Sequence, residues 1–344
     1  MTVTRIPVID LELALSDDAP AELIASVRDS AEQIGILQVV NHGVPAELID
    51  EFHDRIGRIL DLPREEKKAL ASPTGHPYRG WRQWPDDFGR LELERFSISR
   101  FGTPEEAVAA GLPAEHAGLY AHANVWPQDD PGLEELAKRY HDASVGVAEK
   151  TLALYAKVIG VPASVFPIEG RPYYTSFVVN NYPTWTYADD AATADEDKLL
   201  LLEHADGSAL TVLHQRGDYE GLQGQTPDGS WVPVPIVPGA LQVFSGSLLT
   251  RWTNGRLRPG RHRVVAGGTV TRRSTAVFWH PSLDTVIEPL QPFVDPAEGS
   301  DYEPSLLWDE IKDNVEEYLQ VFGRPEQVAA WREGRPYVAD LAEA

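Results

Sequence analysis

The chain has 344 residues, of which 42% are hydrophobic and 24% are charged, the composition of a folded protein rather than a disordered one. Its formal net charge of −23 argues against binding to nucleic acid or to an anionic lipid surface, because both would repel it. It contains no cysteine, which excludes disulfides, thiolate metal sites and cysteine nucleophiles, so a metal site would have to use His, Asp or Glu.

The first half of the chain is predicted to be mainly helical. Residues 6–11 form a short β-type run, and four helical segments follow, of which 62–70 is short and charged and the others carry apolar residues at helical spacing. These segments are 19–34, 45–60, 62–70 and 130–162. Gly35 follows the first of them as a stop signal. Strands are expected at 36–43 and 92–101, whereas 72–90, rich in Gly, Pro and Trp, is expected to be a loop.

The pattern changes at about residue 173. From there to about 280, short β-type runs alternate with turns rich in Gly, Pro, Asn and Asp, which is typical of a sandwich or barrel. The acidic segment 188–197 is predicted to be a mobile loop, and two helices are predicted near the end. We therefore expect an α+β protein with a mainly β core. Its parts are a helical region 1–165 wrapped on a β core 173–285, with helices within 300–335, all in a single domain 1–344.

The N-terminal segment has no apolar stretch of the signal-peptide type, and the chain has no run of 18 or more apolar residues. We expect a cytoplasmic protein that does not enter membranes. Arg outnumbers Lys, which together with abundant Ala and Gly favours a bacterial origin.

His204 and Asp206 stand two residues apart beside a strand-like run. Residues two apart in a strand point to the same face, about 6–7 Å from each other, so this pair could hold a metal ion, exchange a proton or face solvent. A third candidate, His262, follows 56 residues after Asp206 at the start of another strand-like run. Two histidines and one carboxylate form the ligand set of non-haem Fe(II) oxygenases.

A second constellation follows within 271–279. If that segment is a strand, one face carries Arg272, Ser274 and Phe278, and the guanidinium with its neighbouring hydroxyl could clamp a carboxylate at the mouth of an apolar pocket. Arg273 would point outward into solvent.

These motifs, in this order, resemble the isopenicillin N synthase-like branch of the Fe(II)/2-oxoglutarate-dependent dioxygenases. That family has His-x-Asp, then His after some 50–60 residues, then Arg-x-Ser about ten residues later. The resemblance covers nearly the whole chain. Further matching segments are IPVIDL, GILQVVNHGVP, PREEKKAL, NVWP, NNYP, ALTVLHQRGDYEGLQ, PGALQVFSG and TNGRLRPGRHRVV.

The resemblance implies a double-stranded β-helix, a jelly-roll or cupin-like barrel with flanking N-terminal helices and a C-terminal helix. It implies that His204, Asp206 and His262 hold Fe(II), and that Arg272 and Ser274 bind the distal carboxylate of 2-oxoglutarate. Two more positions, Asn180 and Tyr182, match an element near the inner end of that co-substrate.

The activity implied is oxidation of a small molecule with O2, by hydroxylation, desaturation or other chemistry, with release of succinate and CO2. We expect it to serve bacterial specialised metabolism. The carboxylate of Asp206 argues against halogenation, for which related enzymes have a small residue at this position.

Three other functions stay open on the sequence alone. An isopenicillin N synthase-like oxidase would need no 2-oxoglutarate and would use Arg272 to hold the carboxylate of the substrate itself. A non-catalytic ligand-binding module could share the fold, although such relatives usually lose iron ligands. The third is a zinc hydrolase, but the sequence contains no His-Glu-x-x-His motif.

Arg79, Trp81 and Phe278 are candidate substrate contacts, and Arg79 or Arg100 could pair with a substrate carboxylate. Other tryptophans could extend an aromatic lining, namely Trp84, Trp126 and Trp185. The sequence specifies neither the substrate nor the oligomeric state.

Three further histidines are expected to make local hydrogen bonds rather than to bind metal. They are His42, His214 and His280.

Overall fold

The computed structural model describes residues 3, 5–73, 75–76, 78–85, 91–114, 116, 122–167, 172–182, 199–217, 221–265, 271–297, 299–322 and 325–333. Within these ranges, eight strands form one large sheet and four form a smaller one. The large sheet runs in the order β1 (Val8–Asp10), β2 (Ile36–Val40), β10 (Leu241–Ser245), β7 (Leu210–Arg216), β12 (Arg272–His280), β5 (Tyr174–Tyr182), β4 (Leu91–Ile98) and β3 (Gly80–Pro85). The smaller sheet runs in the order β6 (Leu199–His204), β11 (His262–Val265), β8 (Leu222–Gln225) and β9 (Trp231–Pro233).

All neighbouring strands in the two sheets are antiparallel except β1 and β2. A separate two-stranded ribbon joins β13 (Val286–Ile287) to β14 (Ser305–Leu306).

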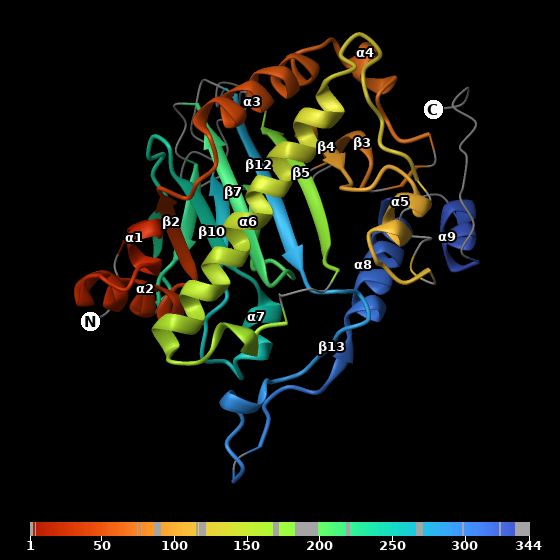
Figure 1. Ribbon diagram of the computed structural model, residues 1–344. Helices are drawn as coiled ribbons and strands as arrows, with labels where there is room; N and C mark the ends of the chain where they lie inside the picture. The colour runs from red at the N-terminus through yellow and green to blue at the C-terminus, as the bar shows by residue number, and fades with distance from the viewer. Residues whose placement is uncertain are drawn as a thin grey trace, which may run out of the picture.

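The helices cover the outer face of the large sheet and its ends (Figure 1). They are α1 (Leu11–Leu15), α2 (Ala21–Gln33), α3 (Ala46–Leu60), α4 (Arg64–Lys68), α5 (Pro104–Ala109), α6 (Leu133–Ile159), α7 (Ser247–Trp252), α8 (Leu307–Phe322) and α9 (Pro325–Arg332), with short 3₁₀ turns at Ala163–Val165 and Gln291–Phe293. The long α6 crosses the face of the sheet, and it ends at Gly160, whose φ of 78° is the left-handed conformation that glycine adopts readily.

Strand β12 separates two hydrophobic cores. Its residues Val277 and Trp279 pack in the core under the helices, and Thr275 bonds the hydroxyl of Tyr140 on α6 at 2.7 Å. Ala276 and Phe278 point the other way, into a second core between the sheets, to which strands of both sheets contribute. This alternation confirms the prediction that every second residue of the strand faces one interior.

The α+β class with a mainly β core is confirmed, the predicted helix 130–162 corresponds to α6, and the two helices expected near the end correspond to α8 and α9. The prediction of a loop over 72–90 is wrong in part, because residues 80–85 form the edge strand β3 on β4. Trp81, only 6% exposed, anchors that strand in the core. Short elements such as α1, α5 and α7 were not predicted.

The acidic segment 188–197 lies outside the described residues. Among the helices that the structure describes, no candidate for crossing a membrane is found. The single-domain organisation and the cytoplasmic location stay predictions.

Candidate metal centre

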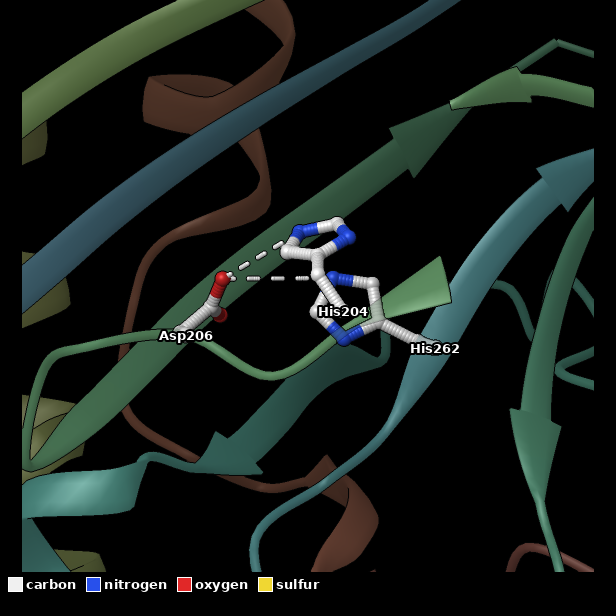
Figure 2. Close-up of side chains that lie close together, drawn as sticks. All are labelled: His204, Asp206 and His262. Atoms are coloured by element: carbon white, nitrogen blue, oxygen red, sulfur yellow. Dashed lines mark ion pairs between the residues drawn. The ribbon is translucent and has the colours of Figure 1, made fainter. Parts of the chain in front are cut away.

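Three potential metal ligands, His204, Asp206 and His262, lie close together at the ends of strands of the smaller sheet and in the turn that follows β6. His204 is the last residue of β6, His262 is the first of β11, and these two pair directly across the strands. The carboxylate of Asp206 faces both imidazoles, with its Oδ1 3.6 Å from Nε2 of His204 and 4.0 Å from Nε2 of His262 (Figure 2). One ligand atom from each residue lies within 4.8 Å of the others, and no other such group of three or more occurs in the described parts of the chain.

The route by which Asp206 reaches the site differs from the expectation. Strand β6 ends at His204, so the pair does not share one strand. Asp206 stands in the turn between β6 and β7 instead, and its backbone oxygen accepts a 2.8 Å hydrogen bond from Ser247 at the start of α7. The turn, rather than the strand pleat, therefore aims this carboxylate.

Each ligand is oriented by a second contact on its other side. Nδ1 of His204 lies 2.8 Å from the Leu202 carbonyl oxygen, and Nδ1 of His262 lies 2.9 Å from that of Gly260. Since a carbonyl only accepts, Nδ1 carries the proton in the neutral imidazoles, and Nε2 keeps its lone pair for a metal.

The carboxylate of Asp206 is oriented in the same manner. Its Oδ2 accepts a 2.6 Å hydrogen bond from the Thr211 hydroxyl, which leaves Oδ1 toward the histidines. Sequence reasoning missed Thr211, because nothing in the motif marks which strand residue lies under the turn.

The site is also electrostatically suited to a cation. Burial alone would raise the pKa of Asp206, but His262, His204 and the Thr211 hydroxyl outweigh it and hold that pKa at about 2. Burial lowers the pKa of His262, so that ring tends to be neutral. Burial also acts to lower the pKa of His204, but Asp206 outweighs it and raises that pKa, so a metal ion would have to displace the proton of this ring at low pH. An anionic carboxylate and a neutral imidazole are the protonation states in which these residues bind a metal.

The separations also fit an ion. Two ligands about 2.1 Å from a metal and at right angles lie about 3 Å apart, so the two distances from Asp206 to the histidines need to close by about 1 Å or less. Nitrogen and oxygen donors without thiolate suit Fe(II). The residues present therefore fit the ion that this ligand set implies.

Gly246, which precedes α7, packs closely against the backbone of the turn that carries Asp206. A Cβ on this residue would lie 1.8 Å from the Ser208 carbonyl oxygen, so only glycine permits this close approach of the α7 start to the turn. It closes the segment PGALQVFSG, whose role in the site was not predicted.

A small cavity of about 50 Å³ adjoins the three ligands. On one side it is lined by Arg272, which is 1% exposed, and by Ser274. The Arg272 guanidinium donates to Gln215 Oε1 at 3.0 Å and to Ser274 Oγ at 3.4 Å, and it stacks 4.9 Å from the centre of the Tyr182 ring. Asn180 of β5, which pairs with Ser274 of β12, also lines this cavity.

A second cavity of about 210 Å³ adjoins the first, and the two share Arg95, Asn180 and Phe278 in their walls. It lies along the inner face of β5, next to β4, β12 and α8. Its lining residues are Tyr78, Arg95, Ser97, Tyr174, Ser176, Val178, Asn180, Gly207, Ser208, Phe278, His280, Ile311 and Asn314.

Of the predicted substrate contacts, Phe278 lines both cavities, whereas Arg79 and Trp81 line neither. Arg79 is buried and donates to the backbone oxygens of His122 and Tyr78, which gives it a structural role.

The other candidates lie elsewhere. Arg100 pairs with Asp142 at 2.7 Å, and Trp126 packs partly buried against Phe96. Trp185 and the side chain of Trp84 lie outside the described residues.

His42 and His214 make the local contacts expected of them. His42 accepts from the Val44 amide and contacts the Gly239 oxygen, and His214 bonds His53 at 2.8 Å. The expectation for His280 is wrong for one of its nitrogens, because its buried Nδ1 has no hydrogen-bond partner in the structure.

Arg273 is a further correction, because it is not merely solvated. It points outward as predicted, but it donates to Asn181 and pairs with Asp61.

Comparisons with known proteins agree with this geometry. Residues 6–129 match the family model for the N-terminal region of non-haem dioxygenases in morphine synthesis, and residues 174–281 match that of the 2OG-Fe(II) oxygenase superfamily. The chain is 30% identical over 272 residues to validamycin A dioxygenase of Streptomyces hygroscopicus subsp. limoneus, covering 76% of this chain and 72% of that protein.

Solved structures show the same fold. The dioxygenase for auxin oxidation in rice is 27% identical with a TM-score of 0.67, over 91% of this chain and 96% of that one. A 2OG-Fe(II) oxygenase family protein from Caulobacter crescentus is 23% identical with a TM-score of 0.74, over 92% and 100%. Together these matches show that the chain belongs to the isopenicillin N synthase-like family of the 2OG-Fe(II) oxygenase superfamily, with its double-stranded β-helix, and is a 2-oxoglutarate-dependent dioxygenase that requires Fe(II), 2-oxoglutarate and O2.

Proposed function

We propose that this enzyme oxidises a small molecule in the larger cavity, by hydroxylation, desaturation or ring chemistry, with His204, Asp206 and His262 as the Fe(II) ligands. The observation that carries the proposal is the orientation of the three side chains. Both imidazoles are fixed with Nε2 toward the carboxylate, and the carboxylate is fixed with Oδ1 toward the imidazoles.

Arg272 and Ser274 hold the distal carboxylate of 2-oxoglutarate. The supporting observation is a permanent positive charge, 1% exposed, beside a hydroxyl in a cavity whose only acidic lining residue, among those described, is Asp206 at the metal. A guanidinium can donate two parallel hydrogen bonds to a carboxylate, and burial strengthens both. Asn180 and Tyr182 complete the wall of this co-substrate site.

With Fe(II) and 2-oxoglutarate bound, the centre supplies the activation of O2, and succinate and CO2 are the products. The protein's own contribution would be to hold the co-substrate in the smaller cavity beside the three ligands and the substrate in the adjoining larger cavity. Phe278, which lines both cavities, provides an apolar wall that limits water at their junction.

A role in bacterial specialised metabolism is part of the proposal. It is supported by the relative from Streptomyces, whose printed name is validamycin A dioxygenase.

The test is Fe(II) binding and 2-oxoglutarate turnover in two aspartate variants. Asp206→Ala should lose both, because it removes an oriented ligand. Asp228→Ala, at an exposed turn, should keep both. Normal Fe(II) affinity and turnover in folded Asp206→Ala would contradict the ligand assignment.

A further inference from the structure

Arg95 occupies the junction of the two cavities, and neither the sequence motifs nor the relatives single it out. It lies on β4 directly opposite Asn180 of β5, and its Nε donates to Asn180 Oδ1 at 3.0 Å. This bond holds the guanidinium in the wall that the cavities share. Burial raises the pKa of Tyr78, which also lines the larger cavity, and the positive charge of Arg95 partly offsets that rise.

The described residues that line the larger cavity carry permanent charge of one sign only, which is positive. Among the described residues that line it, Arg95 is the only one with a permanent charge, and none is an aspartate or a glutamate. Burial lowers the pKa of His280 to about 4, so that ring is neutral near pH 7. A local positive site stands out in a protein with a net charge of −23.

Arg95 and Arg272 lie far enough apart in the sheet to bind two different anions. Arg95 pairs with Asn180, and Asn180 pairs with Ser274, so Arg95 lies two strands from Ser274. Two strand spacings amount to about 10 Å. Arg272 is two residues further along β12. Both guanidiniums line the smaller cavity, but only Arg95 also lines the larger one.

The remainder of the larger cavity suits a compact, largely apolar body. Every second residue of β5 from Tyr174 to Asn180 faces it, over a length of about 20 Å. Tyr78, Phe278 and Ile311 supply apolar surface. Polar groups lie among them, namely those of Ser97, Ser176, Asn180, Ser208 and Asn314. A volume of about 210 Å³ lies below the usual range of about 300–1,000 Å³ for ligand pockets, so the cavity suits only a small molecule.

We infer that the substrate is a small aromatic or alicyclic carboxylate whose anionic group binds Arg95 at the metal end of the larger cavity. The inference rests on the proposed function and narrows it to a substrate class. Arg95 is then the residue that distinguishes an acid from its neutral analogue.

The test uses two acid–amide pairs of matched shape, phenylacetate with phenylacetamide and indole-3-acetate with indole-3-acetamide. Calorimetry measures their binding to the anaerobic protein loaded with Fe(II) and 2-oxoglutarate. Each acid that fits should bind about tenfold or more tightly than its amide, the effect of one charge-assisted hydrogen bond.

Arg95→Gln should abolish this preference. Arg95→Lys keeps the positive charge but loses the paired N–H donors of the guanidinium, so it should keep part of the preference. Arg100→Gln is the matched control, because Arg100 pairs with Asp142 and lines neither cavity. It should keep the full preference. Thermal unfolding of each variant checks folding, and Arg95→Lys carries the test if Arg95→Gln does not fold.

Equal binding of acid and amide to the wild type overturns the inference, as does binding of neither at millimolar concentration. A preference that survives in Arg95→Gln also overturns it, since the acid would then be held elsewhere. If Arg95→Gln weakens 2-oxoglutarate binding as much as acid binding, Arg95 belongs to the co-substrate site and the inference fails. Failure of 2-oxoglutarate to bind the wild type is a separate result, which contradicts the proposed function.

Discussion

Replacing Arg272 with glutamine should raise the requirement for 2-oxoglutarate sharply. The guanidinium is 1% exposed, and the contacts that hold it, to Gln215, Ser274 and the Tyr182 ring, leave it beside the metal. Loss of a desolvated, charge-assisted contact to a carboxylate costs about 2–4 kcal/mol. At about 1.4 kcal/mol per factor of ten, this corresponds to a rise of about 30-fold to 1000-fold in the half-saturating concentration.

The neighbouring arginine provides a matched control. Arg273 lies on the other face of β12, where it pairs with Asp61 and Asn181. Arg273→Gln should leave the 2-oxoglutarate requirement within about twofold of the wild type, and it should cost about 1 kcal/mol or less of stability, since the Asp61 partner is largely exposed.

The assay is succinate formation against 2-oxoglutarate concentration, with thermal unfolding to show that each variant is folded. An unchanged requirement in folded Arg272→Gln would refute the co-substrate role. It would instead favour a role for Arg272 in holding the substrate, as in an oxidase that needs no 2-oxoglutarate.

The geometry around the site leads to three further predictions. Thr211→Val removes the hydroxyl that orients the metal-binding carboxylate and should weaken Fe(II) binding about 10-fold to 100-fold, measured by anaerobic titration; unchanged affinity would contradict its positioning role. Gly246→Ala would place a Cβ 1.8 Å from the Ser208 oxygen and should weaken Fe(II) binding about tenfold or more, whereas Gly146→Ala, with open space around it, should not; equal effects would count against the packing argument. Burial lowers the pKa of His280 to about 4, below its usual 6.5, so the unfolded state binds more protons and stability falls as the pH drops from about 6.5 toward 4. That loss is about 2 kcal/mol at about pH 5 for one such group. Other buried histidines, such as His122 and His214, add losses of their own, so in urea unfolding at about pH 7 and pH 5 the wild type should lose about 2 kcal/mol more than His280→Gln.

The sequence predicted those features of the site that depend on alternation within one strand. Arg272, Ser274 and Phe278 face one interior because side chains alternate along β12, and this needs no knowledge of the neighbours. The family pattern also singled out His204, Asp206 and His262, which the structure brings together.

Features that depend on which strands become neighbours could not be predicted in this way. Arg95 reaches the site because β4 pairs with β5 in a register that sets it opposite Asn180, and no local pattern encodes that pairing. Thr211 and Gly246 act through a turn whose path is fixed by contacts between β6, β7 and α7. Tertiary pairing likewise turned part of the expected loop 72–90 into β3.

The central claim is that 2-oxoglutarate binds at the metal held by His204, Asp206 and His262, with Arg272 as its anchor. The most direct test is anaerobic addition of 2-oxoglutarate to the Fe(II)-loaded protein, observed by visible absorption. We predict a weak charge-transfer band of a chelated keto acid, present in the wild type and in Arg273→Gln and lost in Arg272→Gln at the same concentration. Iron binding without any such band in the wild type would contradict the account.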